Sequence, residues 1–166
     1  RLVVYRIDGR SMTPILNEKV MAGLGREGAR TGALSKDGVE HALRAIRRFA
    51  TLIDALQIQD VFAVGTAAVR EAKDGKEFAA RMEAESGIKL RVLSGEDEAR
   101  LSALGVSAGA PDAKGIVGDL GGASLELIEI GPKGVGRGET FPVGPLALMD
   151  GEFDYARLDP ARTYGG

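Results

Sequence analysis

The sequence GDLGGAS at residues 118–124 decides the fold prediction, because it joins two strands through a turn of glycines. Residues 115–119 predict a buried strand, and residues 124–130 predict the next one. Successive backbone N–H groups in such a turn point into one hollow and can hold a phosphate. Gly121 and Gly122 suit that hollow, since a Cβ would keep an anion away. A plain hairpin turn explains the same glycines equally well.

The polar residues of this turn suit a metal-assisted phosphate site. Asp119, at the end of the first strand, would hold a divalent cation, usually through water, or orient an attacking water. Ser124 adds a hydroxyl donor to the backbone donors of the turn, in which Ala123 also lies. Because a strand rather than a helix follows, the Rossmann and Walker A phosphate loops are excluded.

The strands around the turn form an antiparallel meander that starts a second unit. A third strand is predicted over 135–142, and Gly144-Pro145 would introduce a helix. The breaker Gly109-Ala110-Pro111-Asp112 separates this unit from the residues before it. We therefore expect two domains, at 1–110 and 111–166, the second of them truncated.

The first domain is predicted to combine an antiparallel meander with parallel strands. Short apolar runs predict the meander at residues 2–7, 11–17 and 18–24, and Asp8-Gly9 forms its first turn. The later elements are a helix over 36–56, a strand covered on both faces over 61–64, a helix over 75–86, a strand over 88–92 and a helix over 96–108. This alternation implies parallel strands with right-handed crossovers, joined to the antiparallel edge. The fold class is therefore α/β.

Three of these helices carry capping signals at their first turn. Ser35 is the predicted N-cap of the longest helix, and Asp74 with Glu77 forms a capping-box pattern before the second. Ser94 with Asp97 forms the same pattern before the third.

Residues 94–101, SGEDEARL, place three carboxylates in the first turn of the third helix. Acidic residues there complement the helix macrodipole, and the cap accounts for Asp97. Glu98 lies on another side of the helix from Asp97, and its carboxylate would suit a base that takes a proton from water. On spacing alone, a purely structural role is the preferred interpretation.

Thr66 and Arg70 follow the strand at 61–64, at an end where ligands gather in open α/β sheets. The forked guanidinium of Arg70 could pair with phosphate oxygens. A surface arginine beside Glu71 is an equally good interpretation of the same residues.

The composition is that of an ordinary globular protein. The 166 residues are 44% hydrophobic and 28% charged, and 22 basic against 24 acidic residues give a net charge of −2. This balance gives no reason to expect nucleic acid or an anionic membrane as a partner. The absence of cysteine excludes disulfides, thiolate metal sites and cysteine nucleophiles. No apolar run reaches the roughly 20 residues of a membrane span and no secretion signal opens the chain, so we expect a cytoplasmic protein.

Five segments, taken together and in order, resemble the exopolyphosphatase and guanosine pentaphosphate phosphohydrolase (Ppx/GppA) family. They are GLGREGARTGALS at 23–35, VGTAAVREA at 64–72, SGEDEARL at 94–101, IVGDLGGASLELIEI at 116–130 and FPVGPLALMD at 141–150. The resemblance implies the actin-like, ribonuclease H-like fold of the ASKHA superfamily, with two similar α/β domains around a phosphate cleft. Because both ends of the chain look cut, we expect it to be a fragment of such a protein.

Position by position, the resemblance implies roles for nine residues. Glu98 matches the family's catalytic carboxylate, which activates water. Asp119 matches the Mg²⁺-linked aspartate, and Glu126 matches an acidic residue that helps to organise metal or water. The phosphate-binding positions that match are Thr66, Arg70, Gly121, Gly122, Ala123 and Ser124. For Glu98 and Arg70 the resemblance favours function over the structural interpretation.

Two departures from the family pattern bear on this expectation. Ala123 stands where the family's DxGGGS loop has its third glycine, and a methyl group is tolerated there if φ is negative. The family's first phosphate loop, an Asp-x-Gly-Ser segment, should lie immediately before Leu2. We therefore expect this fragment alone to be inactive.

The expected function is hydrolysis of the terminal phosphate of inorganic polyphosphate, of guanosine pentaphosphate, or of both, with Mg²⁺ as the cofactor. An ATP-dependent kinase or ATPase of the same superfamily is the first alternative. A protein that binds polyphosphate or ppGpp without turnover is the second, and Ala123 is its one argument in the sequence. A homodimer is suggested by family habit alone.

Overall fold

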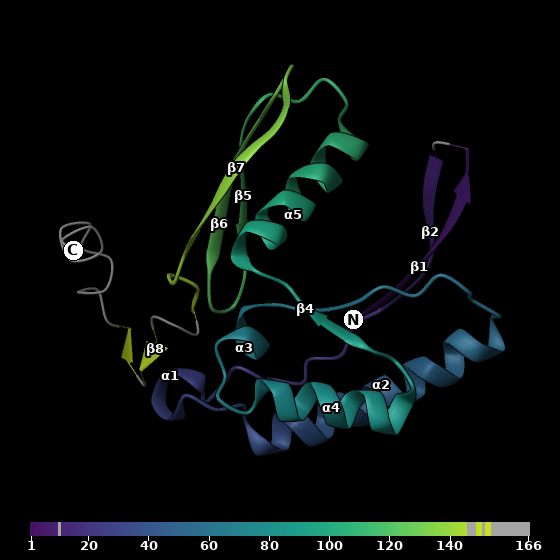
Figure 1. The fold of residues 1–166 in the computed structure, drawn as a ribbon, viewed down its shortest axis with the longest axis vertical. Helices are drawn as coiled ribbons and strands as arrows, with labels where there is room; N and C mark the ends of the chain where they lie inside the picture. The colour runs from purple at the N-terminus through teal and green to yellow at the C-terminus, as the bar shows by residue number, and fades with distance from the viewer. Residues whose placement is uncertain (10, 146–148, 151, 154–166) are drawn as a thin grey trace.

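The computed structural model describes residues 1–9, 11–145, 149–150 and 152–153, and its main elements form two groups in chain order, residues 2–92 and 95–141 (Figure 1). The elements of the first group are β1 (Leu2–Asp8), β2 (Ser11–Glu18), α1 (Gly28–Thr31), α2 (Lys36–Ala55), β3 (Ala63–Gly65), α3 (Ala67–Arg70), α4 (Gly75–Ser86) and β4 (Leu90–Val92). The second group contains α5 (Gly95–Gly109), β5 (Gly115–Leu120), β6 (Leu125–Gly131) and β7 (Gly134–Phe141). A short antiparallel pair, β8 (Met149–Asp150) and β9 (Glu152–Phe153), follows them.

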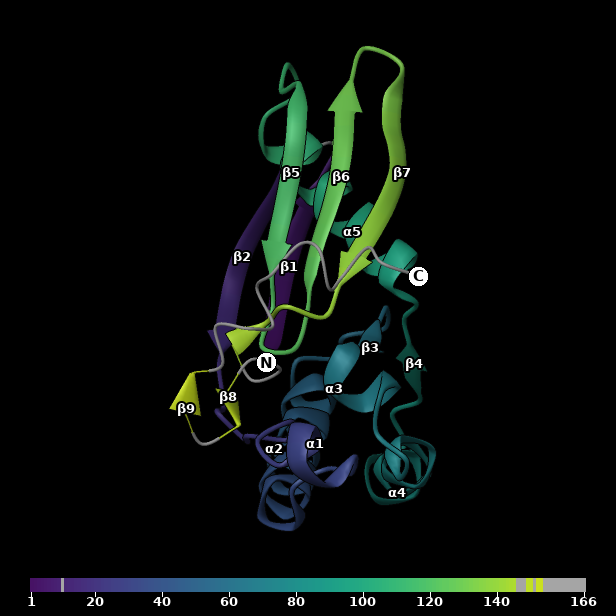
Figure 2. The same ribbon diagram turned by 90° about the vertical axis from the view of Figure 1, so that its left-hand side faces the viewer.

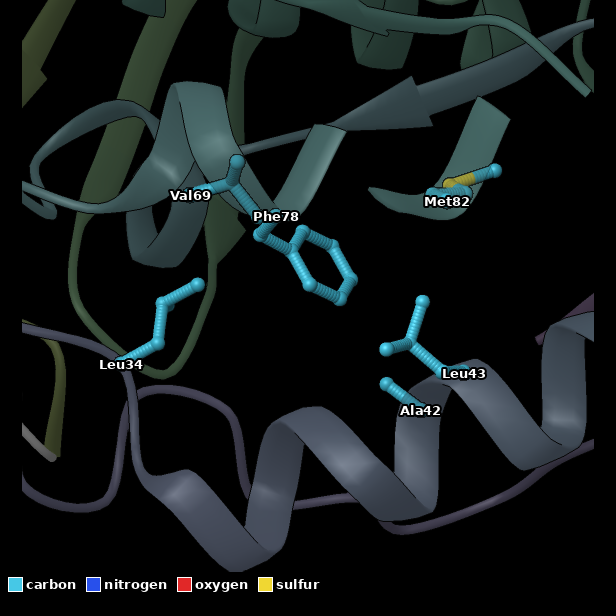
Figure 3. Close-up of a cluster of buried hydrophobic side chains, with 6 residues drawn as sticks. All are labelled: Leu34, Ala42, Leu43, Val69, Phe78 and Met82. Atoms are coloured by element: carbon cyan, nitrogen blue, oxygen red, sulfur yellow. The ribbon is translucent and has the colours of Figure 1, made fainter. Parts of the chain in front are cut away.

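The first hydrophobic core lies between α2 and α4 (Figure 3). Leu43 of α2 is completely buried, and Phe78 and Met82 of α4 are buried as their helical spacing predicts. The members of this core are Leu34, Ala42, Leu43, Val69, Phe78 and Met82. Beside it, β3 and β4 pair in parallel, which confirms the parallel pairing predicted for the first half of the chain.

The second core lies between α5 and a three-stranded antiparallel sheet in the order β5-β6-β7 (Figures 1 and 2). Ile128 and Ile130 of β6 pack against Ala99 and Ala103 of α5. A Cβ on Gly138 of β7 would lie only 2.6 Å from the Cβ of Ala99, so glycine is what lets the helix approach the strand this closely. The start of α5 is therefore fixed to this sheet.

Several predicted helix ends are confirmed by their local geometry. The Oγ of Ser35 accepts a hydrogen bond from the Gly38 N–H at 3.4 Å at the start of α2. α4 ends at Ser86, and Gly87 after it has the left-handed φ of 70° that favours glycine. The antiparallel meander predicted after residue 115 is also present.

Residues 18–24 do not form the predicted third strand of an N-terminal meander. β2 ends at Glu18, and the chain then turns at Gly23, which has a φ of 73° and whose carbonyl accepts the Arg26 N–H at 3.1 Å. β1 and β2 instead form a two-stranded sheet of their own, not the edge of the β3–β4 sheet.

Asp74 does not cap α4 as its spacing from Glu77 predicted. Its side chain makes no hydrogen bond to the first turn of α4. Its Oδ1 accepts the Leu34 N–H at 2.9 Å, so it ties the segment before α2 to the segment before α4. The Asp74 carboxylate therefore bonds to a backbone group 40 residues away in the chain and not to the first turn of α4.

The strand predicted over 61–64 begins two residues later than expected, and it is not covered on both faces. It is β3, at Ala63–Gly65, and the Phe62 side chain before it is 89% exposed. Among the described residues β3 pairs with β4 alone, so its other edge has no neighbouring strand. Residues of β3 also line an apolar hollow of about 380 Å³, together with Leu2, Phe49 and Leu90.

In the part of the chain that the structure describes, no helix combines the length and apolarity needed to cross a bilayer. The helix predicted after Gly144-Pro145 falls mostly on residues 146–148, which lie outside the described residues. The division into domains at residues 110 and 111 stays a prediction.

Candidate functional site

Glu98 projects from the first turn of α5, and its side chain is 13% exposed. Ser94 begins this helix as predicted, because its Oγ accepts the Asp97 N–H at 3.1 Å. The Asp97 carboxylate turns to the surface and pairs with Arg91 at 3.4 Å. The capping residues and Glu98 thus have separate partners, and Glu98 is not needed for the cap.

Arg70, at the end of α3, holds Glu98 from the first group of elements. Its Nη1 donates to the Glu98 Oε2 at 3.1 Å and to the Leu93 carbonyl at 3.0 Å. Its Nε donates to Glu71 at 2.9 Å. The Arg70 side chain pairs with Glu71, as the surface interpretation expected, but it is largely buried, at 20% exposed, and also holds Glu98.

Thr66 precedes α3 and is exposed. Its carbonyl accepts the Arg70 N–H at 3.0 Å, but its side chain makes no capping hydrogen bond to α3. Its predicted contact with phosphate stays a prediction.

Asp119 and Glu126 face each other directly across the β5–β6 pair. Opposite residues of an antiparallel pair point to the same face of the sheet, which here is the face that α5 covers. The Ser102 hydroxyl of α5 donates a hydrogen bond to the Asp119 Oδ2. The two predicted metal ligands are therefore neighbours, and one of them is already held by the helix that carries Glu98.

Glu126 is the most unusual group of the site, because its side chain is 1% exposed and neither carboxyl oxygen has a hydrogen-bond partner. Burial raises the pKa of the Glu126 carboxyl above its ordinary value, and the charges of Glu98 and Asp119 raise it further. Arg70 and the nearby Ser124 hydroxyl act in the opposite direction, although the Ser124 Oγ does not reach hydrogen-bond geometry. A buried, unpaired carboxylate is costly, so this group suits a cation.

The glycine turn lies beside these carboxylates. The Gly121 N–H donates to the Ser124 carbonyl at 2.8 Å and closes the turn. Among the described residues Gln57 is the one residue other than glycine with positive φ, so Ala123 keeps a backbone conformation that tolerates its methyl group. The backbone of Gly144, after β7, lies directly against that of Gly122 and Ala123.

The donor set fits a magnesium ion. Mg²⁺ takes oxygen ligands, and it is usually bound through one or two carboxylates together with water and substrate phosphates. Asp119 and Glu126 supply two carboxylates. Both carboxyl oxygens of Glu126 and the hydroxyl oxygen of Ser124 are buried and have no hydrogen-bond partner. No group of three or more His, Cys, Asp or Glu side chains suited to a metal occurs in the described ranges. An ion here would therefore depend on water and phosphate for its other ligands.

The structure thus brings most of the predicted residues together. Arg70 contacts Glu98, Asp119 lies opposite Glu126, and the charges of Arg70, Glu98 and Asp119 all act on the Glu126 carboxyl. Sequence reasoning missed Ser102. Its position four residues after Glu98, on the same side of the helix, was the available signal.

The chain matches known proteins over nearly all of its length. The sequence model of the Ppx/GppA phosphatase family matches residues 3–158. The chain is 31% identical over 128 residues to Exopolyphosphatase 1 of Mycobacterium bovis and of Mycobacterium tuberculosis, a match that covers 76% of this chain and 37% of each relative.

Solved structures show the same fold. The Ppx/GppA family member of Aquifex aeolicus superposes with a TM-score of 0.77 at 29% identity, over 88% of this chain and 48% of that one. An exopolyphosphatase of Cytophaga hutchinsonii gives 0.78 at 25% identity, over 90% and 49%. An exopolyphosphatase-like protein gives 0.82 at 26% identity, over 95% and 52%. The α/β fold is thus the predicted actin-like one, and the chain spans about half the length of these structures.

Proposed function

The chain belongs to the Ppx/GppA phosphatase family, and from this premise we propose that the whole protein is an exopolyphosphatase. It would hydrolyse the terminal phosphate of inorganic polyphosphate, of guanosine pentaphosphate, or of both. The observation that carries the proposal is the placement of Glu98, which the Arg70 ion pair holds within the same cluster of charges as Asp119 and Glu126.

Glu98 is the proposed base. Its Oε2 accepts the hydrogen bond from Arg70, which leaves Oε1 to accept a proton from the attacking water. The largely buried position of the side chain and its fixed partner hold the carboxylate in one place. Positioning of this kind suits phosphoryl transfer, in which the protein contributes geometry and charge stabilisation rather than covalent chemistry.

The other residues of the site would bind the phosphate chain. The turn from Gly121 to Ser124 would bind phosphate through its backbone N–H groups other than that of Gly121, which donates to the Ser124 carbonyl. Arg70 and Thr66 lie on the side of the site formed by the first group of elements. Asp119 and Glu126 would hold Mg²⁺, which when bound would offset the negative charge of the phosphates. Because Ala123 has an ordinary φ, it gives no support to a protein that binds without turnover.

The test is Glu98→Gln in the whole protein, assayed by phosphate release from polyphosphate and from guanosine pentaphosphate with Mg²⁺. We expect the rate to fall by at least about 100-fold, because the amide cannot accept the proton. The matched control is Glu96→Gln, which alters an exposed carboxylate in the same helical turn and should leave the rate unchanged.

Rates within a few-fold of wild type for Glu98→Gln would remove Glu98 from the catalytic role. Transfer of phosphate to an added acceptor in place of water would favour the kinase alternative. The relative rates on the two substrates decide the preference between them. The cytoplasmic location and the homodimer expected from the sequence stay predictions.

A further inference from the structure

Ser102 uses its hydroxyl differently from the other helical serines with described hydrogen bonds. A serine inside a helix commonly donates to the carbonyl four residues earlier. Ser107 of α5 does so to Ala103 at 3.0 Å, and Ser86 of α4 does so to Met82 at 2.6 Å. Ser102 instead donates across the helix–sheet interface to the Asp119 carboxylate. Its hydroxyl therefore serves a contact between elements.

The acceptor of this hydrogen bond is one of the two carboxylates that face each other on β5 and β6. A carboxylate has about four lone-pair positions, of which the Ser102 hydroxyl occupies one. The remaining positions of Asp119 stay available, beside the buried and unpaired oxygens of Glu126. The hydrogen bond thus fixes the orientation of Asp119 without using up its capacity for a cation.

Ser102 also shares a rigid element with Glu98. The two residues are four apart on α5 and so lie on one face of the helix, one above the other. Close packing at Ala99 and Ala103 holds that helix against the sheet. Any shift of α5 would consequently move Glu98 and the orientation of Asp119 together.

We propose that Ser102 is a positioning residue, which orients the Asp119 carboxylate toward a divalent cation. This inference rests on the proposed function of the site and adds a residue to it. The competing explanation is purely structural, namely that the hydrogen bond only fastens α5 to β5. The two explanations differ in what happens to cation affinity.

The experiment compares Ser102→Ala, Ser102→Thr and Ser107→Ala in the whole protein. Mg²⁺ binding is titrated by calorimetry without substrate, and the metal-free proteins are unfolded in urea. We expect Ser102→Ala to bind Mg²⁺ about 10- to 100-fold more weakly, the usual range when a group that orients a metal ligand is removed. Ser102→Thr keeps the hydroxyl and should restore most of the affinity. Ser107→Ala, which removes a local hydrogen bond on the same helix, should bind as wild type does.

Phosphate release gives a second readout. Ser102→Ala should need a higher Mg²⁺ concentration for half of its maximal rate, by the same factor, while its rate at saturating Mg²⁺ stays within a few-fold of wild type. Introducing Ser102→Ala into Asp119→Asn should then cause little additional loss of affinity, because the hydroxyl acts through that carboxylate.

Wild-type Mg²⁺ affinity in Ser102→Ala would overturn the proposal, whatever the change in stability, and would leave the structural explanation. If Ser102→Ala does not fold, Ser102→Cys, a weak donor of similar size, takes its place under the same criteria. A wild-type protein that releases phosphate but binds no Mg²⁺ would overturn the metal assignment together with this proposal. A wild-type protein that binds Mg²⁺ but releases no phosphate would overturn the hydrolase alone.

Discussion

At the residue scale, the buried carboxyl of Glu126 makes the stability of the protein depend on pH. Its pKa is raised above the ordinary value of 4.5, first by burial and then by Glu98 and Asp119. The folded protein therefore keeps this proton to higher pH than the unfolded chain does. Linkage then requires the contribution of Glu126 to the free energy of unfolding to be largest below the ordinary value and to fall as pH rises through the raised pKa.

Glu126→Gln should remove this pH dependence. In the absence of Mg²⁺ we expect the variant to be more stable than wild type by about 1 kcal/mol at pH 8, because glutamine avoids the cost of burying an unpaired charge. Near pH 4 the difference should shrink, because wild type is then neutral at this position as well. Urea unfolding at both pH values measures it, with Glu129→Gln as the control at an exposed position of the same strand. An equal difference at both pH values would contradict the prediction.

At the element scale, the contact between α5 and β7 depends on two small residues, Ala99 and Gly138. Gly138→Ala would place a methyl group 2.6 Å from the Ala99 Cβ and push the start of α5 away from the sheet. We expect a loss of about 1–3 kcal/mol in the free energy of unfolding, as is usual for overpacking. Phosphate release should fall as well, since Glu98 is the neighbour of Ala99 on the helix.

Gly136→Ala is the matched control on β7. A Cβ there meets its nearest atom, the Glu129 carbonyl oxygen, at 3.4 Å, which is ordinary contact. Its stability should stay within about 0.5 kcal/mol of wild type. Urea unfolding compares the two variants. Equal losses in the free energy of unfolding would show that alanine destabilises β7 at either position, and that the contact with Ala99 is not the cause.

The helices of this chain were easier to predict from the sequence than its strands. Helical spacing predicted α2, α4 and α5 well, and the predicted caps of α2 and α5 are confirmed, because those signals are local: Ser35 and Ser94 cap their helices as expected. The segment at 18–24 and the exposed Phe62 were misjudged, because a strand is defined by partners that lie elsewhere in the chain. The helix cap predicted for Asp74 was wrong for the same reason, because its hydrogen-bond partner is 40 residues away.

In the candidate site too, local features could be predicted from the sequence and contacts between separate elements could not. Glycines and acids in a turn predicted the neighbourhood of Asp119, whereas Glu126 entered only through the family resemblance. Its place opposite Asp119 is a finding of the structure. The Arg70–Glu98 ion pair and the Ser102 hydrogen bond join separate elements, so no local pattern contained them. The sequence pattern had marked Glu98 and Arg70 as candidates, but only the family resemblance favoured a functional role for them over a structural one.

At the scale of the whole molecule, the two hydrophobic cores are separate, and β4 leads into α5 between them. Leu43→Ala should cost about 2–5 kcal/mol in the first core, where Leu43 is fully buried. Hydrogen exchange of backbone amides should show that loss in α2 and α4, with a much smaller loss of protection in β6. Equal losses in both regions would show that the cores unfold as one unit, contrary to expectation.

The apolar hollow beside β3 has a practical consequence for studying this protein. Phe62 lines that hollow and is 89% exposed, so the folded chain presents apolar surface to solvent. Sulfate and phosphate at high concentration are excluded from protein surfaces and so drive such patches together. We therefore expect concentrated sulfate to promote association of the chain through this surface, and light scattering should accompany any assay in which anions compete for the proposed phosphate site.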